Sequence, residues 1–305
     1  MARSYRYLHY DVFTDHLFGG NQLAVFLDGR GLTAETMQAI AKEMNFSEST
    51  FLLPAETPDT DVRMRIFTPA EELPMAGHPT IGTTFALARS GAIDPGRQNF
   101  VFGCTIGPVP VTMTWNGDDL AFAWMTQRLP VFGTTIPDPE RVAAALSLSP
   151  AAVAGTGLPV QIVSCGVPFL YVPLTTRMAV DNVVVDAKAL AALFAGASMP
   201  PHGVFVFSAE PGDARATVYS RMFAPELGIT EDPATGSASG PLGCYLVKYK
   251  VVQAGKSESM ISLQGAKMGR PSHVHVAIGL DRDLISSVRV GGEAVLAGEG
   301  TLYIA

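Results

Sequence analysis

The stretch Arg65-Ile-Phe-Thr-Pro69 returns later in the chain as Arg221-Met-Phe-Ala-Pro225. In each copy an alternating strand pattern ends at a proline, and an acidic patch, a turn of small residues and an apolar helix follow. The first turn is Ala76-Gly-His-Pro-Thr80 and the second is Ala234-Thr-Gly-Ser-Ala238. The spacing is 156 residues at the strand (65 to 221) and 158 at the turn (76 to 234). A repeat of this length indicates a duplicated domain, because solenoid repeats are far shorter.

Strand patterns outnumber helix patterns around both copies, and each copy contains one apolar helix, over residues 79–89 and 236–247. A helix that is apolar all round needs burial on every side, so the simplest packing wraps a curved sheet around it. We expect an α+β protein with two pseudo-symmetric domains, each a curved, mostly antiparallel sheet around a central helix. One half-domain is expected over 1–127 with C-terminal strands at about 288–305, and the other over 128–287. The active site is expected in the cleft between them, because such clefts are favoured ligand sites.

The composition supports this size of core and excludes several classes of protein. The chain has 305 residues, of which 48% are hydrophobic, which is enough for two domains. Its net charge is -7 and no cluster of lysines and arginines is present, which argues against binding to nucleic acid. No stretch approaches the ~20 apolar residues that span a bilayer, and the N-terminus lacks the apolar region of a signal peptide. We therefore expect a cytoplasmic protein without a membrane partner.

Cysteine and histidine usage does not indicate a metal or a disulfide framework. Cys104, Cys165 and Cys244 form no CxxC pair, so we expect buried free thiols. His273 and His275 share one face of a predicted strand and could begin a zinc site, but no third ligand has suggestive spacing.

Local patterns also predict individual elements. Thr33 is expected to cap a helix that ends at Asn45. Residues 130–139 contain prolines and a glycine and are interpreted as a linker.

Both repeated turns lie where a helix begins. The N–H groups and positive dipole end of a helix N-terminus hold anions without lysine or arginine. Pro79 suits the first helical turn, because its missing N–H costs nothing there. The turns at His78 and at Gly236-Ser237 are therefore candidate sites for a substrate carboxylate. The alternative interpretation is that Asp232 and Ser237 only cap a helix.

Glu48 is the candidate acid/base. It follows a predicted helix end and lies near two apolar residues, Phe46 and Phe51. Apolar surroundings raise the pKa of a carboxyl group, which suits a group that takes and returns a proton near neutral pH. The alternatives are that Glu48 is a solvated loop residue and that His78 is a structural turn histidine. Glu71-Glu72 is interpreted as a solvated pair.

Several segments, taken together, resemble the phenazine biosynthesis F protein family across nearly the whole chain. They include Gly20-Asn21, Ser47-Glu-Ser-Thr-Phe51, Arg65-Ile-Phe-Thr-Pro69, Ala76-Gly-His-Pro-Thr80, Glu231-Asp-Pro-Ala-Thr-Gly-Ser-Ala238 and Gly269-Arg-Pro-Ser272. That family is similar in fold to diaminopimelate epimerase, which has two pseudo-symmetric domains, each a sheet around a central helix.

The resemblance implies a cofactor-independent isomerase similar to trans-2,3-dihydro-3-hydroxyanthranilate isomerase. Glu48 would shuttle a proton between two carbons of a small cyclic amino or hydroxy carboxylic acid. His78, Asp232 and Ser237 would bind or polarise the substrate, with Asn21 among the substrate-binding residues. The amides of Gly77, Gly236 and Ser237 would hold its carboxylate. The resemblance implies no metal and no organic cofactor, and a homodimer.

The sequence departs from the related patterns in two places. Ala76 stands where the epimerases have a cysteine, and the second turn has no cysteine either, which disfavours thiol chemistry. Gln22 stands where the family commonly has proline, so the substrate stays open. Two alternatives remain: an amino-acid epimerase or racemase that uses Glu48 and Asp232, and a small-molecule binder without turnover.

Overall fold

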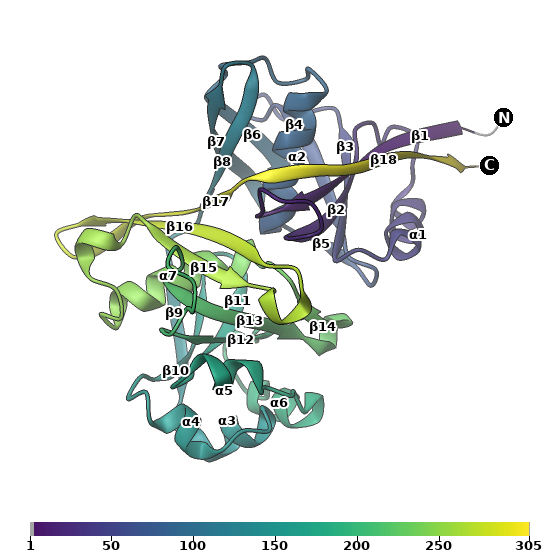
Figure 1. Cartoon of the computed structure of the whole chain (residues 1–305). Helices are drawn as coiled ribbons and strands as arrows, with labels where there is room; N and C mark the ends of the chain where they lie inside the picture. The colour runs from purple at the N-terminus through teal and green to yellow at the C-terminus, as the bar shows by residue number, and fades with distance from the viewer. Residues whose placement is uncertain (1–2, 305) are drawn as a thin grey trace. The chain divides into compact units, whose positions relative to one another are not determined.

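A computed structural model describes residues 3–304, and Figure 1 colours them from purple at the N-terminus to yellow at the C-terminus. The chain forms two compact units. Unit 1 contains the residues up to Thr126 and those from Gly291 onward, and unit 2 is Gln127–Val290.

Unit 1 is built on strands paired in the order β18-β1-β2-β3-β4-β6-β7-β8, and β5 adds to β4. The pairs are antiparallel except β2–β3 and β4–β6. The strands are β1 (Arg3–Val12), β2 (Asn21–Phe26), β3 (Glu48–Leu53), β4 (Val62–Phe67), β5 (Glu72–Leu73), β6 (Asn99–Cys104), β7 (Gly107–Asn116), β8 (Asp119–Gln127) and β18 (Ala294–Ile304).

Unit 2 repeats this order as β9-β10-β11-β12-β13-β15-β16, with β14 added to β13. Its parallel pairs, β11–β12 and β13–β15, occupy the same places as those of unit 1. The same order of strands therefore recurs in the two units. The strands are β9 (Val131–Ile136), β10 (Val160–Ser164), β11 (Pro168–Pro173), β12 (Val204–Ser208), β13 (Val218–Ala224), β14 (Ile229–Asp232), β15 (Met260–Gln264), β16 (Ser272–Asp281) and β17 (Leu284–Gly292).

The two repeated helices, α2 (Gly77–Arg89) and α7 (Gly236–Lys248), each have 13 residues. Helix α2 is buried from Gly77 to Leu87 and packs on β1, β2 and β3, while α7 packs on β16, β10 and β11. The other helices are α1 (Ala34–Met44), α3 (Pro139–Ala145), α4 (Pro150–Ala154), α5 (Arg177–Asp181) and α6 (Ala187–Phe194), and short 3-10 turns cover Pro225–Leu227, Ala254–Lys256 and Ala266–Met268. Over residues 3–304, no helix has the length and apolar character to cross a membrane.

Small residues let the buried helices approach the strands. A Cβ atom on Gly82 of α2 would lie 2.6 Å from Val12 Cγ2 and 2.7 Å from Leu23 Cδ2. In α7, a Cβ atom on Gly240 would lie 2.0 Å from the side-chain oxygen of Gln127. Interiors are close-packed, so neither position has room for a larger side chain.

The opposite face of each sheet is also covered. Helix α1 packs its apolar side against β2 and β3 of unit 1, where Phe26 stacks on Phe51 with ring centroids 4.7 Å apart. The predicted ends of α1 are confirmed, because Thr33 accepts from the backbone of Thr36 and Asn45 closes the helix in the left-handed conformation. In unit 2, helices α3 to α6 gather on one side of the strands (Figure 1) and enclose an aliphatic core that includes Leu170, Val172, Leu190 and Val204.

The interpretation of residues 130–139 as a linker is wrong. Strand β9 occupies Val131–Ile136 and pairs antiparallel with β10. The prolines that suggested a linker flank the strand, whereas the residues inside it are mostly β-branched or aromatic and suit a sheet. Pro139 then begins α3, which Asp138 caps.

Candidate active site

Glu48 is the first residue of β3 and lies opposite Leu23 of the parallel strand β2. Asn45, in the left-handed conformation at φ 53°, ends helix α1, and β3 begins three residues later at Glu48. The side chain is buried, with 9% of the residue exposed. Glu48 is therefore not a solvated loop residue.

His78 is the second residue of α2 and meets Glu48. Its Nε2 lies 3.1 Å from Glu48 Oε2, a close approach that is not aligned as a hydrogen bond. Its Nδ1 lies 3.2 Å from the side-chain nitrogen of Asn21. Three of the residues predicted from sequence are thus in one cluster on the α2 side of the unit 1 sheet.

Burial keeps the His78 imidazole neutral. Desolvation lowers the pKa of His78 from 6.5 to about 3, and a hydrogen bond with the backbone of Gln22 opposes this only in part. In the neutral imidazole one ring nitrogen carries the hydrogen and the other accepts, so His78 can present either a donor or an acceptor to Glu48 at Nε2.

We expect the neutral state of His78 to make unit 1 sensitive to acid. Between about pH 6.5 and pH 3 the imidazole of the unfolded chain binds a proton that the folded one does not. The free energy of unfolding therefore falls as the pH falls through this range, and the full contribution of His78 is present above pH 6.5. As the pH is lowered across this range, the free energy of unfolding of wild type should fall by about 1 kcal/mol more per pH unit than that of His78→Gln. Urea unfolding at several pH values measures the difference, because Trp115 and Trp124 both report on unit 1.

His16→Gln is the control for this measurement. The His16 side chain is 82% exposed and also lies in unit 1. Its free energy of unfolding should change with pH as that of wild type does. An equal change with pH for His78→Gln and wild type would contradict a neutral His78 in the folded protein.

Neither repeated helix is capped by a side chain at its start. The N-cap residues are Ala76 for α2 and Thr235 for α7, and neither side chain accepts a hydrogen bond from the helix. The interpretation that Asp232 caps α7 is wrong, because Asp232 precedes the N-cap position and its carboxylate accepts from the Thr235 hydroxyl instead. The N-cap side chains therefore do not occupy the amide groups of the first turns, at Gly77 and at Gly236 and Ser237.

Asp232 ends β14 and is held by a network that the sequence did not reveal. Thr235 Oγ1 donates to Asp232 Oδ2 over 2.5 Å. Gln264, fully buried at the end of β15, donates to the Asp232 carbonyl at 2.8 Å and accepts from the Thr235 backbone at 3.0 Å. Gln127 donates to the Gly236 carbonyl at 2.9 Å. These glutamines carried one faint signal, a polar residue at the end of an apolar strand.

The cysteines lie outside both helix N-termini, and all three are buried free thiols, as predicted. Burial raises the pKa of Cys104 to about 12. The hydrogen bond with Cys244 and burial raise the pKa of Cys165 well above its usual range. Thiolates are the reactive form of cysteine, so these groups do not suit acid–base exchange at neutral pH.

The remaining sequence candidates have structural partners. His273 Nε2 lies 3.2 Å from Asp213 Oδ2 and 3.1 Å from the Arg215 guanidinium. Within the described residues, no group of three histidine, cysteine, aspartate or glutamate side chains is arranged to hold a metal ion. The interpretation of Glu72 as solvated is wrong, because it forms a two-point pair with Arg65 at 2.8 and 2.6 Å.

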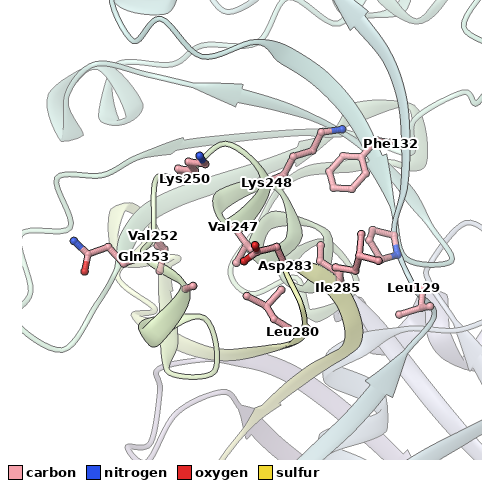
Figure 2. A pocket seen from close by; sticks show the side chains of 13 residues that line it. Leu129, Phe132, Val247, Lys248, Lys250, Val252, Gln253, Leu280, Asp283 and Ile285 are labelled. Atoms are coloured by element: carbon pink, nitrogen blue, oxygen red, sulfur yellow. The ribbon is translucent and has the colours of Figure 1, made fainter.

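A cavity of about 990 Å³ in unit 2 lies at the end of α7 and contains none of the predicted site residues. Figure 2 shows the Lys248 ammonium beside the Phe132 ring, 3.7 Å from its centroid, with Leu280 and Ile285 on the wall. Its volume alone would make this cavity a candidate active site, but it lacks a buried carboxylate and imidazole that could transfer a proton.

Known proteins with the same architecture define the class. A phenazine biosynthesis protein from Bacillus anthracis has a TM-score of 0.85 and 26% identity, covering 98% of this chain and 99% of that chain. A predicted epimerase from Pseudomonas aeruginosa has a TM-score of 0.82 and 34% identity over the same shares of the two chains. The trans-2,3-dihydro-3-hydroxyanthranilate isomerase of Pseudomonas aeruginosa is 34% identical over 300 residues, covering 98% of this chain and 100% of the relative.

The mixed α/β fold and these relatives identify an enzyme of the isomerase and epimerase class. The family model described as phenazine biosynthesis-like protein matches residues 10–300. The chain belongs to this phenazine biosynthesis-like family, and the resemblance inferred from the sequence motifs is confirmed.

Proposed function

We propose that this protein is a cofactor-independent isomerase that moves a proton between two carbons of a small cyclic amino or hydroxy carboxylic acid. The observation that carries the proposal is the contact between the buried Glu48 carboxyl group and the neutral His78 imidazole at 3.1 Å. A relative named trans-2,3-dihydro-3-hydroxyanthranilate isomerase, similar over its whole length, supports the same class of reaction.

Glu48 acts as the acid/base in this proposal. Its carboxylate removes a proton from one ring carbon, the electrons shift along the conjugated system, and the carboxyl group returns the proton to another carbon on the same ring face. Proton number and charge balance, so no external oxidant or reductant is needed. His78 orients the carboxyl group through Nε2 and is itself held by Asn21. A positioned carboxyl group of this kind contributes roughly 10²–10⁴-fold to rate.

The substrate carboxylate is assigned to backbone amides. Gly77 begins α2, and Gly236 and Ser237 begin α7, in both cases without a capping side chain. The positive end of a buried helix favours an anion there, despite the net charge of -7. Asp232, held by Thr235 and Gln264, binds or polarises the amino or hydroxy groups of the substrate.

The direct test is turnover in deuterated water. Wild-type protein incubated with trans-2,3-dihydro-3-hydroxyanthranilate should move the double bond and introduce solvent deuterium at the carbon that receives the proton. Proton NMR measures both changes in one experiment. Thermal stabilisation by the compound without any product would instead identify a small-molecule binder and refute the proposal.

A second candidate is an epimerase or racemase that uses Glu48 and Asp232 as its two acid/base groups. It is favoured by two buried carboxylates, because Asp232 lies shortly before α7 and Glu48 contacts His78 in the first turn of α2. The similar protein called a predicted epimerase also favours it. The two candidates give different products, because an epimerase inverts a stereocentre and leaves the double bond in place. Chiral chromatography of the same reaction separates them.

A homodimer and a cytoplasmic location belong to the same proposal. Light scattering coupled to size-exclusion chromatography measures the first, and a mass near that of one 32.3 kDa chain would contradict it.

A further inference from the structure

The repeat extends to a pair of ion pairs with the same geometry. In unit 1 the Arg65 guanidinium on β4 donates through two nitrogens to Glu72 on β5, at 2.8 and 2.6 Å. In unit 2 the matching Arg221 on β13 donates through the same two nitrogens to Glu231 on β14, both at 2.8 Å. Two parallel bonds of this kind fix orientation as well as distance.

Each arginine also covers an aromatic ring two residues further along its own strand. Arg65 lies 5.1 Å from the centroid of Phe67, and Arg221 lies 4.7 Å from the centroid of Phe223. The guanidinium is thus held on one side by a ring and at its edge by a carboxylate, which lysine cannot reproduce. We call these two assemblies the Arg65 clamp and the Arg221 clamp.

The clamps are not ordinary surface pairs. The Arg221 and Glu231 side chains are 8% and 14% exposed, and those of Arg65 and Glu72 are 20% and 30% exposed. Arg221 also donates to the carbonyls of Val180, Asp181 and Val183 at the end of α5. Partly buried, two-point pairs with further hydrogen bonds constrain their surroundings much more than exposed ion pairs do.

Their position in the chain connects each clamp to a proposed site residue. Glu231 immediately precedes Asp232, and both belong to β14. Glu72 lies on β5, the last strand before Ala76 begins the turn into α2 and His78. Strand β5 has only two residues and β14 has four, so few ladder hydrogen bonds hold either one. A clamp across such a short pairing adds a side-chain restraint on where the following turn lies, beside the Gln264 bonds at Asp232 and the bond from the Ile106 amide to the Pro74 carbonyl.

We propose that the two clamps position the turns that carry His78 and Asp232, and that Arg65 and Arg221 are positioning residues for the reaction. This inference rests on the proposed function for its effect on rate, but not for its effect on structure. A small misplacement of reacting groups costs up to about 10²-fold in rate, so a loosened clamp lowers kcat while the fold persists.

The test compares Arg65→Lys and Arg221→Lys with Arg97→Lys. Arg97 is a matched control, because it pairs with Asp61 at 2.5 Å and covers the Phe100 ring at 5.0 Å, but it precedes no repeated helix. Amide hydrogen exchange is measured by mass spectrometry on the intact protein. Arg65→Lys should speed exchange over residues 74–80, Arg221→Lys over residues 230–238, and Arg97→Lys over neither.

Steady-state kinetics on trans-2,3-dihydro-3-hydroxyanthranilate gives the second readout. Each clamp variant should lower kcat about tenfold or more, with a much smaller change in KM, whereas the control should keep both. Glu231→Gln keeps the shape of the acceptor without its charge and replaces Arg221→Lys if that variant does not fold.

The outcomes separate the two proposals. If Arg65→Lys and Arg221→Lys show the same amide exchange as Arg97→Lys, the proposal that the clamps restrain the turns is overturned, whatever the activity of the variants. Local acceleration of exchange with unchanged kcat overturns their part in the reaction. Local acceleration in a protein whose wild type does not turn over the compound supports the clamps as restraints on the turns and refutes the proposed substrate instead.

Discussion

Glu48→Gln should lower the isomerase activity by about 10²–10⁴-fold, while the protein keeps its fold and its melting temperature. Glutamine has nearly the shape of glutamate and still offers an oxygen to His78 Nε2, so the packing around the buried side chain is preserved. It cannot take a proton from carbon, however, and no other described carboxylate is in contact with His78. Incorporation of deuterium from solvent, followed by proton NMR, measures the loss directly.

Glu43→Gln is the matched control for this variant. Glu43 lies on α1 in the same unit and is exposed, and its substitution changes the net charge by the same amount. It should retain the activity of wild type within about twofold, because an exposed carboxylate away from the turn has no proton to transfer. Undiminished deuterium exchange by Glu48→Gln would remove Glu48 from the mechanism and direct attention to Asp232.

Gly82→Val should destabilise unit 1 by about 3 kcal/mol, at the upper end of the range for overpacked cores. The new Cβ atom would meet Val12 and Leu23 at less than 3 Å, and both residues are fully buried. Relief would require α2 to move away from β1 and β2, which also displaces His78 at its first turn. Urea unfolding followed by tryptophan fluorescence measures the change in the free energy of unfolding.

Gly298→Val tests whether the effect depends on the close approach. Gly298 lies on β18 of the same unit, and no atom lies within 4 Å of the position of its Cβ atom. Valine suits a strand, so this variant should match wild type or be slightly more stable. Equal losses in the two variants would show that glycine at position 82 is not required by packing.

Most of the architecture could be predicted because the sequence is duplicated. Arg65-Ile-Phe-Thr-Pro69 and its second copy indicated two units. The close approach of Gly82 and Gly240 to other elements is visible only in the structure. The ends of α1 followed from Thr33 and Asn45, whose capping roles depend only on neighbouring backbone. Residues 130–139 were misassigned because proline flanks β9, and pairing with the distant β10 decides that strand.

The candidate site likewise could be predicted only in part from the sequence. The order of motifs indicated Glu48, His78 and Asp232, whereas the alternatives of a solvated glutamate and a capping aspartate could be rejected only from burial and hydrogen bonds. The roles of Gln264 and Gln127 could not be assigned from the sequence, because a polar residue at the end of an apolar strand does not indicate which turn it holds. The partnership of Arg65 with Glu72 was hidden for the same reason.

The sequence by itself determined the family, and it indicated the duplication and the candidate acid/base residue, because these depend on residue types in a fixed order. Tertiary structure alone decided the protonation of His78, the contact with Glu48 and the restraint of the Asp232 turn. The physical reason is that desolvation and hydrogen bonding depend on atoms brought together from distant parts of the chain. His78 has an ordinary imidazole in the sequence, and only the burial of α2 lowers its pKa to about 3.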